Sequence, residues 1–169
     1  MNTEEVCDNP AGTHRHLVTR QAMAEAQLEL LRAARREFML ASPMLDAGFW
    51  NSASMARALG QLLAQHRHAR ARLVTEDTEH MLARCARLVE LTRRFSDRIL
   101  IRRLGEAQHG QSGMFAVADR DHCLVQNDVN QIDATLNLAA PRQAAPWLQR
   151  FDVIWDGVEP VPGLHGFRL

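Results

Sequence analysis

The amino-acid sequence predicts an α/β fold, with a mostly parallel sheet, a late antiparallel hairpin and helices on both faces. Short apolar runs of strand length alternate with longer stretches in which apolar residues recur at helical spacing. Such alternation is typical of parallel sheets that are covered by helices on both faces. Two further apolar runs, separated by a tight polar turn, predict the hairpin.

Each element has a local signal in the sequence. A helix is expected from Thr19, where apolar residues begin to recur every three or four positions. The apolar run at 38–41 predicts the first strand, which Ser42-Pro43 ends. Further helices are predicted over 51–66, over 78–92 and from Pro141, and further strands over 72–75, 99–101, 114–118 and 123–126.

Length and composition indicate a single domain. A chain of 169 residues, 46% of them hydrophobic, can bury one ordinary core. We expect this domain to cover residues 19–157. A flexible arm over 1–18, which lacks periodicity, should precede it, and an extended tail over 158–169 should follow it.

The charge composition excludes several catalytic classes. The chain has 20 Lys+Arg and 20 Asp+Glu, every one of those cations is arginine, and tyrosine is absent. Without lysine the protein cannot form a Schiff base or contain a Walker A or protein-kinase lysine. A net charge of zero argues against long-range attraction to nucleic acid or to an anionic membrane.

Cysteine usage and hydropathy predict a cytoplasmic protein with no membrane partner. The three cysteines are odd in number and widely spaced, and two of them lie in apolar patterns, so reduced, buried thiols are expected. No apolar stretch approaches the ~18 residues of a membrane span, and the first ten residues do not form a signal peptide. The cysteines are Cys7, Cys85 and Cys123.

A ligand site is expected where the predicted parallel strands end, because ligands of such sheets bind beyond the carboxyl ends of the strands. The alternative is structural: Asp46 and Asp77 would be turn or cap residues, and the arginines a solvated edge. The residues at these strand ends are Ser42, Asp46, Glu76, Asp77, Arg102 and Arg103.

The remaining metal candidates are Glu76, Asp77 and His80, at the junction of a predicted strand and helix. Together with Asp46 they would serve a metal-assisted hydrolase. The sequence contains neither His-Glu-x-x-His nor Cys-x-x-Cys, so it lacks common zinc spacings, and a capped helix with an exposed imidazole explains the same residues. No metal and no other cofactor is therefore expected.

Nucleic-acid binding is a further alternative. Arginines within 67–72, at 93–94 and at 102–103 could form a local basic edge although the whole chain is neutral. The competing interpretation is that these arginines lie at the C-termini of helices, where cations interact favourably with the helix dipole.

The order of the elements over residues 19–156 resembles one half of the phospholipase D superfamily fold. Three segments carry a narrower resemblance, to a bacterial family of phospholipase D-like domains whose members occur alone or beside GNAT-type acetyltransferase domains. The segments are Ala41-Ser42-Pro43-x-Leu45-Asp46, Phe115-Ala116-Val117-Ala118-Asp119 and Phe151-Asp152-x-x-Trp155-Asp156. This resemblance implies a homodimer with the clefts at the seam, and an acetyltransferase or another protein as a partner.

The catalytic signature of the superfamily, His-x-Lys-x-x-x-x-Asp, is degenerate in this chain. Aligning its aspartate with Asp119 places Ser112 at the histidine and Met114 at the lysine. Serine without a base is a poor nucleophile, and methionine cannot neutralise phosphate charge. His109 comes three residues too early for the motif.

The resemblance therefore implies a non-catalytic phospholipase D-like domain that acts as a binding or regulatory module. A phosphate-bearing ligand would meet Arg102, Arg103 and the loop that carries His109 and Ser112. The alternatives left open by the residues are the metal-assisted hydrolase and the nucleic-acid-binding domain.

Overall fold

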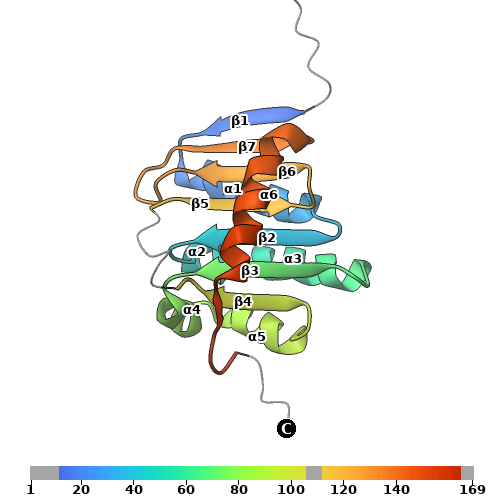
Figure 1. Ribbon diagram of the computed structural model, residues 1–169, viewed down its shortest axis with the longest axis vertical. Helices are drawn as coiled ribbons and strands as arrows, with labels where there is room; N and C mark the ends of the chain where they lie inside the picture. The colour runs from blue at the N-terminus through green and yellow to red at the C-terminus, as the bar shows by residue number, and fades with distance from the viewer. Residues whose placement is uncertain (1–11, 106–111, 165–169) are drawn as a thin grey trace, which may run out of the picture.

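An eight-stranded sheet runs through the centre of the protein (Figure 1). The computed structural model describes residues 12–105 and 112–164. The strands are β1 (Thr13–Leu17), β2 (Glu37–Ser42), β3 (Arg70–Thr75), β4 (Ile99–Arg103), β5 (Met114–Ala118), β6 (His122–Gln126), β7 (Ala134–Leu138) and β8 (Glu159–Pro160). In space they follow the order β1-β7-β6-β5-β2-β3-β4-β8.

The sheet is mixed and mostly antiparallel. Of the seven pairings among the described strands, β2–β3 and β3–β4 are parallel and the other five are antiparallel. The prediction of a mostly parallel sheet was wrong, because β5 does not continue outward from β4. It enters on the other side of β2, and β6, β7 and β1 follow it as an antiparallel meander. The predicted hairpin, β5–β6, is confirmed.

Helices cover both faces of the sheet, as predicted. One helix, α6, packs on one face over Met39, Val74 and Phe115, while the other helices pack on the opposite face over Leu40 and Leu73. Among the described residues, no helix combines the length and the apolar character that a bilayer span requires. The helices are α1 (Arg20–Ala33), α2 (Ala47–Trp50), α3 (Ala53–Gln65), α4 (Thr78–Arg84), α5 (Ala86–Arg94) and α6 (Pro141–Asp156).

Helices α1 and α3 each begin directly after a capping residue. Thr19 accepts a hydrogen bond from the backbone N–H of Ala22 at the start of α1, and Ser52 accepts one from Met55 at the start of α3. The helix predicted over 78–92 is interrupted at Cys85, which has non-helical dihedral angles and a fully buried side chain. The buried stripe nevertheless continues from α4 into α5.

A mostly buried arginine, Arg72, whose side chain is 13% exposed, fastens α6 to the sheet. The guanidinium of Arg72, on β3, lies 5.0 Å from the ring centroid of Phe151 and 5.4 Å from that of Trp155. It also pairs with Glu37 at 2.8 Å and with Asp152 at 3.6 Å. Cations over aromatic faces and charge-assisted hydrogen bonds both stabilise such a contact. Arg72 therefore joins two strands and a helix.

Both edges of the sheet differ from the sequence-based expectation. Residues 13–17, expected within the flexible arm, form β1 and pair with β7. Four of these five residues are exposed, so the strand lacks the apolar alternation that would have revealed it. At the other edge, part of the expected extended tail pairs with β4 as β8.

Candidate functional site

A cleft opens at the carboxyl end of β2, beside the paired ends of β5 and β6. Met114 and Gln126 face each other in the β5–β6 register, and both line two adjoining hollows. One hollow lies on the α1 side of the sheet and the other on the α6 side. This edge is at the left of Figure 1, where the arrow of β2 ends.

The α1-side hollow is lined mainly by apolar side chains. It has a volume of about 440 Å³, and Met23, Phe49, Trp50 and Met114 line it. At its rim, Ile132 is 40% exposed although it is a large apolar residue. Polar and charged side chains complete the lining, among them Arg20 and Asp46. A mostly apolar wall with polar groups that can orient a ligand is typical of small-molecule sites.

The buried polar side chains of this hollow hold the loops around it. Ser42 is 3% exposed and donates a hydrogen bond to the backbone carbonyl of Met44 at 2.7 Å. Gln126, 8% exposed, donates to the carbonyl of Gln131 at 2.7 Å and so secures the loop that follows β6. Asp46 also lines the hollow and caps α2 through the N–H of Gly48.

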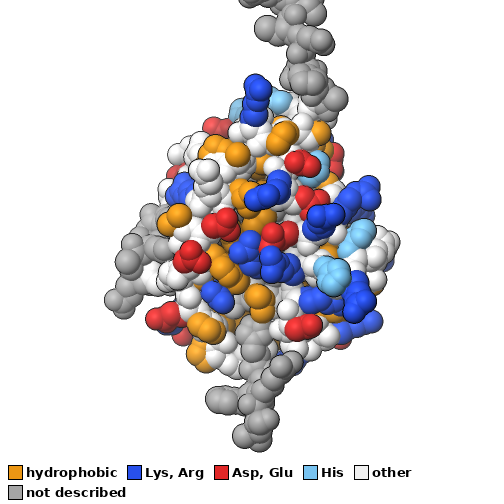
Figure 2. All heavy atoms as spheres, turned by 45° about the vertical axis from the view of Figure 1, so that its right-hand side comes forward, with side chains coloured by type: hydrophobic (Ala, Val, Ile, Leu, Met, Phe, Trp, Pro, Cys, Tyr) orange, Lys and Arg blue, Asp and Glu red, His pale blue; other side chains and the backbone are white. Residues whose placement is uncertain are grey.

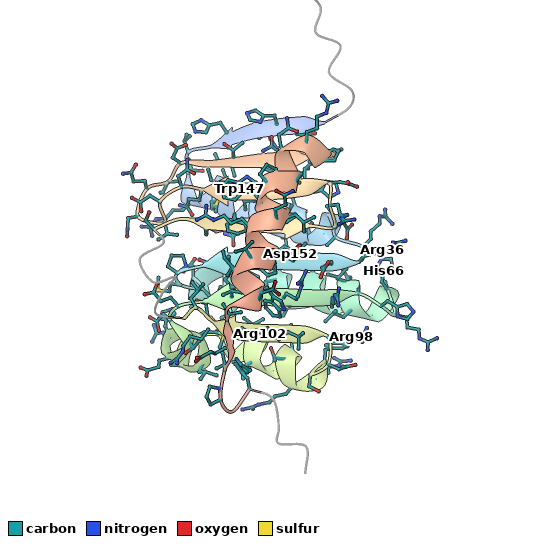
Figure 3. All side chains as sticks on the ribbon, viewed as in Figure 1. Arg36, His66, Arg98, Arg102, Trp147 and Asp152 are labelled. Carbon is teal, nitrogen blue, oxygen red and sulfur yellow. The ribbon has the colours of Figure 1, made fainter. Side chains whose placement is uncertain are left out.

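The α6-side hollow is more polar and contains a cation. It has a volume of about 330 Å³, and Ser112, Trp147 and Arg150 line it. The Arg150 guanidinium lies 5.6 Å from the ring centroids of Phe115 and Trp147. Figure 3 labels Trp147 on α6, where it faces the sheet. The Ser112 hydroxyl donates to the carbonyl of Asn127 at 3.4 Å.

Asp119 lies at the other end of β5 from these hollows. Its carboxylate accepts hydrogen bonds from the backbone N–H groups of Arg35, Arg36 and Glu37, with shortest distances of 3.1, 2.8 and 3.0 Å. Its φ of 54° is a conformation that Asp and Asn tolerate better than most residues. The aspartate at the motif position thus ties the β5–β6 turn to the start of β2.

The structure brings only some of the predicted site residues together. Ser42 and Asp46 share the α1-side hollow, and Ser112 lies in the adjoining one. The other predicted residues within the described ranges line neither hollow, and His109 lies outside those ranges. The residues that line neither are Glu76, Asp77, Arg102 and Arg103.

Most of these residues make their contacts outside the two hollows. Asp77 caps α4 by accepting from the N–H of His80 at 2.8 Å, which is the structural alternative that the sequence left open. Arg102 donates to the carbonyl of Trp155, and its guanidinium lies 4.1 Å from the ring centroid of that residue. Arg103 pairs with Glu159 at 3.5 Å. Both arginines therefore serve the contact of β4 with α6 and β8.

No metal centre is formed by residues 12–105 and 112–164. Within these ranges, no three His, Cys, Asp or Glu side chains come close enough together to hold a metal ion. The trio of Glu76, Asp77 and His80 does not make such a group. The side chain of Asp77 is already bound to the backbone of its own helix.

Sequence reasoning missed most of the cleft lining. Met23 lies on the apolar stripe of the helix predicted from Thr19, Trp50 comes just before the helix predicted over 51–66, and Gln126 ends a predicted strand. Arg150 lies on α6, far along the chain from Ser112. The helical spacing of Trp147 with its neighbours was visible, but that pattern equally describes a core stripe. Only the folded sheet brings these side chains together.

A model described as "Domain of unknown function (DUF7931)" matches residues 19–167. The chain belongs to this family. A comparison with curated protein sequences finds no match.

Solved structures show that the fold is phospholipase D-like. Nuc from Salmonella typhimurium, a phospholipase D family member, superposes with a TM-score of 0.64 at 11% identity, covering 89% of this chain and 99% of that one. NucT from Helicobacter pylori gives 0.61 at 10%, with coverage of 89% and 100%. TrmBL2, an archaeal chromatin protein with a novel mode of DNA binding, gives 0.60 at 13% over 93% of this chain. This chain spans 57% of the length of TrmBL2.

Proposed function

We propose that the protein is a non-catalytic phospholipase D-like binding module that takes a small amphipathic ligand in its cleft. The observation that carries this proposal is Met114, which is 6% exposed and forms the wall common to both hollows. In the aligned motif a phosphate-binding lysine would stand at this position. A thioether in its place favours an apolar group over a phosphate.

The lining also lacks the groups that phosphodiester hydrolysis needs. Among the described residues of the two hollows there is no histidine and no lysine. Ser112 bonds to a backbone carbonyl, which cannot take its proton in the way a general base would. An unactivated serine leaves the cleft able to bind but without a nucleophile.

The two hollows differ in a way that suits an amphipathic molecule. The α1-side hollow offers Met23, Phe49 and Trp50 to an apolar body. The α6-side hollow offers Arg150 to an anionic group. A single ligand with both parts would engage both hollows at their shared wall.

Hydrolysis of bis(p-nitrophenyl) phosphate tests the non-catalytic part of the proposal. We expect purified protein to release no nitrophenol above the buffer rate. The Ser112→Ala and His109→Ala variants serve as comparisons. Turnover by the natural protein that either variant abolishes would overturn the non-catalytic assignment, and it would identify the nucleophile.

A pair of fluorescent probes tests the ligand class. N-phenyl-1-naphthylamine is neutral, and 1-anilinonaphthalene-8-sulfonate adds one anionic group to the same body. We expect both to bind, and Ile132→Ser to weaken both about fivefold or more, since it removes apolar contact area at the rim. Arg150→Gln should weaken only the sulfonate. The matched control is Val153→Ser, because Val153 is 72% exposed and lines neither hollow. Equal binding by the Ile132→Ser and Val153→Ser variants would contradict the proposed site.

We also propose that the protein forms a homodimer and that an acetyltransferase or another protein is its partner. Both proposals rest on the family resemblance of the sequence. Light scattering during size-exclusion chromatography gives the mass directly, and it should be twice the 19.1 kDa of one chain. A monomer over the whole accessible concentration range would overturn the first proposal. Co-purification from the native host tests the second.

Nucleic-acid binding is the second candidate function, favoured by the distribution of arginines in the structure. The sequence placed this function on several arginine clusters. Within them, Arg72 is 13% exposed and pairs with Glu37, while Arg102 and Arg103 contact α6 and β8. Arg67 and Arg70, however, lie at one hollow with further arginines. TrmBL2, one of the structural neighbours, is described as DNA-binding.

A further inference from the structure

A basic hollow lies at the amino ends of β2 and β3, opposite the cleft. It has a volume of about 800 Å³ and is formed by the loops that follow α1 and α3. Figure 2, in which the right-hand side of Figure 1 comes forward, shows arginine and histidine side chains gathered there. Figure 3 labels Arg36 and His66 on this edge, with Arg98 below them. The cationic and imidazole side chains that line the hollow are Arg35, Arg36, His66, Arg67, His68 and Arg70.

Positive charge in this hollow is poorly balanced. Glu37 is the one acidic residue among the described residues that line it. Its carboxylate already pairs with Arg70 at 3.0 Å and with Arg72 at 2.8 Å. Within the described ranges, the side chains of Arg35, Arg36 and Arg67 form no ion pair or hydrogen bond. These three guanidinium groups therefore have their donors available to a ligand.

Helix dipoles do not explain these arginines. Cations stabilise the last turn of a helix, and the effect falls off beyond it. In α1 that place is taken by Arg32, whereas Arg35 and Arg36 follow the end of the helix at Ala33. Arg67 likewise follows the end of α3 at Gln65. Interaction with the helix dipoles therefore does not account for the arginines of this hollow.

The chemistry of the hollow favours phosphate groups over a membrane surface. The only apolar residue among its described lining is Ala69, which is 1% exposed. The large exposed apolar side chains of the described residues all lie outside it, so nothing there would insert among lipids. Guanidinium groups bind phosphate oxygens through two parallel hydrogen bonds. Several such groups at one hollow match a chain of phosphates.

We propose that this hollow binds the phosphate backbone of a nucleic acid without reading its sequence. The proposal rests on the second candidate function and assigns its site to the edge opposite the cleft. No phenylalanine, tryptophan or tyrosine is found among the described lining residues, so the hollow has no large aromatic platform on which successive bases would stack. Phosphate contacts of this kind position a protein on a duplex and carry no sequence information.

Fluorescence anisotropy with a labelled DNA duplex of about 20 base pairs tests the site. At about 0.1 M salt we expect Arg36→Gln/Arg67→Gln to weaken binding about tenfold or more. The slope of log affinity against log salt should fall by about 1 for each phosphate contact that is lost. The matched control is Arg57→Gln/Arg84→Gln, which removes the same charge from exposed arginines outside the hollow. A duplex of scrambled sequence should bind equally well.

Each outcome has a distinct meaning. Equal loss by the hollow variant and the control, or no loss by either, would overturn the assignment to this hollow while nucleic-acid binding itself stood. Absence of binding by the natural protein would overturn both. Stronger binding to vesicles of phosphatidylserine and phosphatidylcholine than to DNA would replace the nucleic acid with a membrane surface. Thermal melting of both variants checks that they remain folded.

Discussion

At the scale of single residues, Asp119 illustrates a structural use for an aspartate at a catalytic motif position. It binds three consecutive backbone N–H groups at the start of β2 and occupies a left-handed conformation. No described residue of the cleft depends on its charge. Asp119 therefore stabilises the fold whether or not the cleft is catalytic.

Replacing this aspartate tests that role. Asp119→Ala should lower the free energy of unfolding by about 1–3 kcal/mol, since three backbone N–H groups lose a charged acceptor. Asp119→Asn keeps one acceptor oxygen and tolerates the same φ, so it should cost about half as much. Urea unfolding measures both. A loss below about 1 kcal/mol for the alanine variant would contradict the structural role.

A lysine at position 114 provides a second test. Met114→Lys places a charge at a buried wall with no acidic partner among the described lining apart from Asp46. It should lower the free energy of unfolding by about 2–5 kcal/mol, whereas Met114→Leu, which preserves volume, should cost less than about 1.5 kcal/mol. Chemical denaturation separates the two. Full stability of the lysine variant would show that the cleft still accommodates the cation of the motif.

Single residues also show what sequence reasoning can reach. Ser42 and Asp46 were predicted because strand ends have a local signal, a polar residue after an apolar run. Gln126 and Arg150 line the cleft through strand and helix packing between distant parts of the chain, for which the sequence contains no local signal. The predicted arginines Arg102 and Arg103 line neither hollow, and their partners come from α6 and β8, which the sequence around them does not reveal.

At the scale of elements, local periodicity predicted helices α1, α3 and α6 and strands β2 to β6, within a few residues at most of their ends. It missed β1, because β1 is polar and lies at an edge of the sheet. It also missed β7, although Ala134, Leu136 and Leu138 alternate there with polar residues. It also missed the order of pairing. Whether β5 joins β4 or β2 depends on contacts between whole strands, and the pattern within each strand is the same in either case.

The attachment of α6 yields a prediction at this scale. Arg72→Ala removes an ion pair between β3 and Glu37 of β2, and an ion pair and two cation–π contacts between β3 and α6. It should lower the free energy of unfolding by about 2–3 kcal/mol. Arg72→Lys should recover little of this stability, since an ammonium lacks the planar guanidinium that contacts both rings. The near-ultraviolet circular dichroism of Trp155 should change in both variants. A stable lysine variant with an unchanged spectrum would contradict the proposed attachment.

At the scale of the whole molecule, the composition leaves few groups that titrate at alkaline pH. With neither lysine nor tyrosine, only the three cysteines and the terminal amine titrate between about pH 8 and about pH 11. Burial raises the pKa of the Cys85 thiol, and the nearby Asp46 carboxylate adds to this. Burial also raises the pKa of Cys123, against a hydrogen bond from Asn137 that lowers it. Cys7 lies outside the described residues.

These raised values predict a loss of stability at high pH. The folded protein holds the thiol protons more tightly than the unfolded chain, so the stabilisation is complete below the ordinary thiol pKa of about 8.5 and is lost as the pH rises above it. Urea unfolding at about pH 8 and about pH 10 should show this decline. Cys85→Ala/Cys123→Ala should be less stable throughout but show a smaller decline. Equal declines in both proteins would refute the assignment to these thiols.

Strand β2 has the cleft at one end and the basic hollow at the other. Its six residues span about 20 Å at the usual rise of a strand. A molecule held at either end therefore leaves the opposite end unobstructed, and the two occupants need not compete for space. Under the two proposals, the protein can bind a small ligand at one end of β2 and a nucleic acid at the other end at the same time.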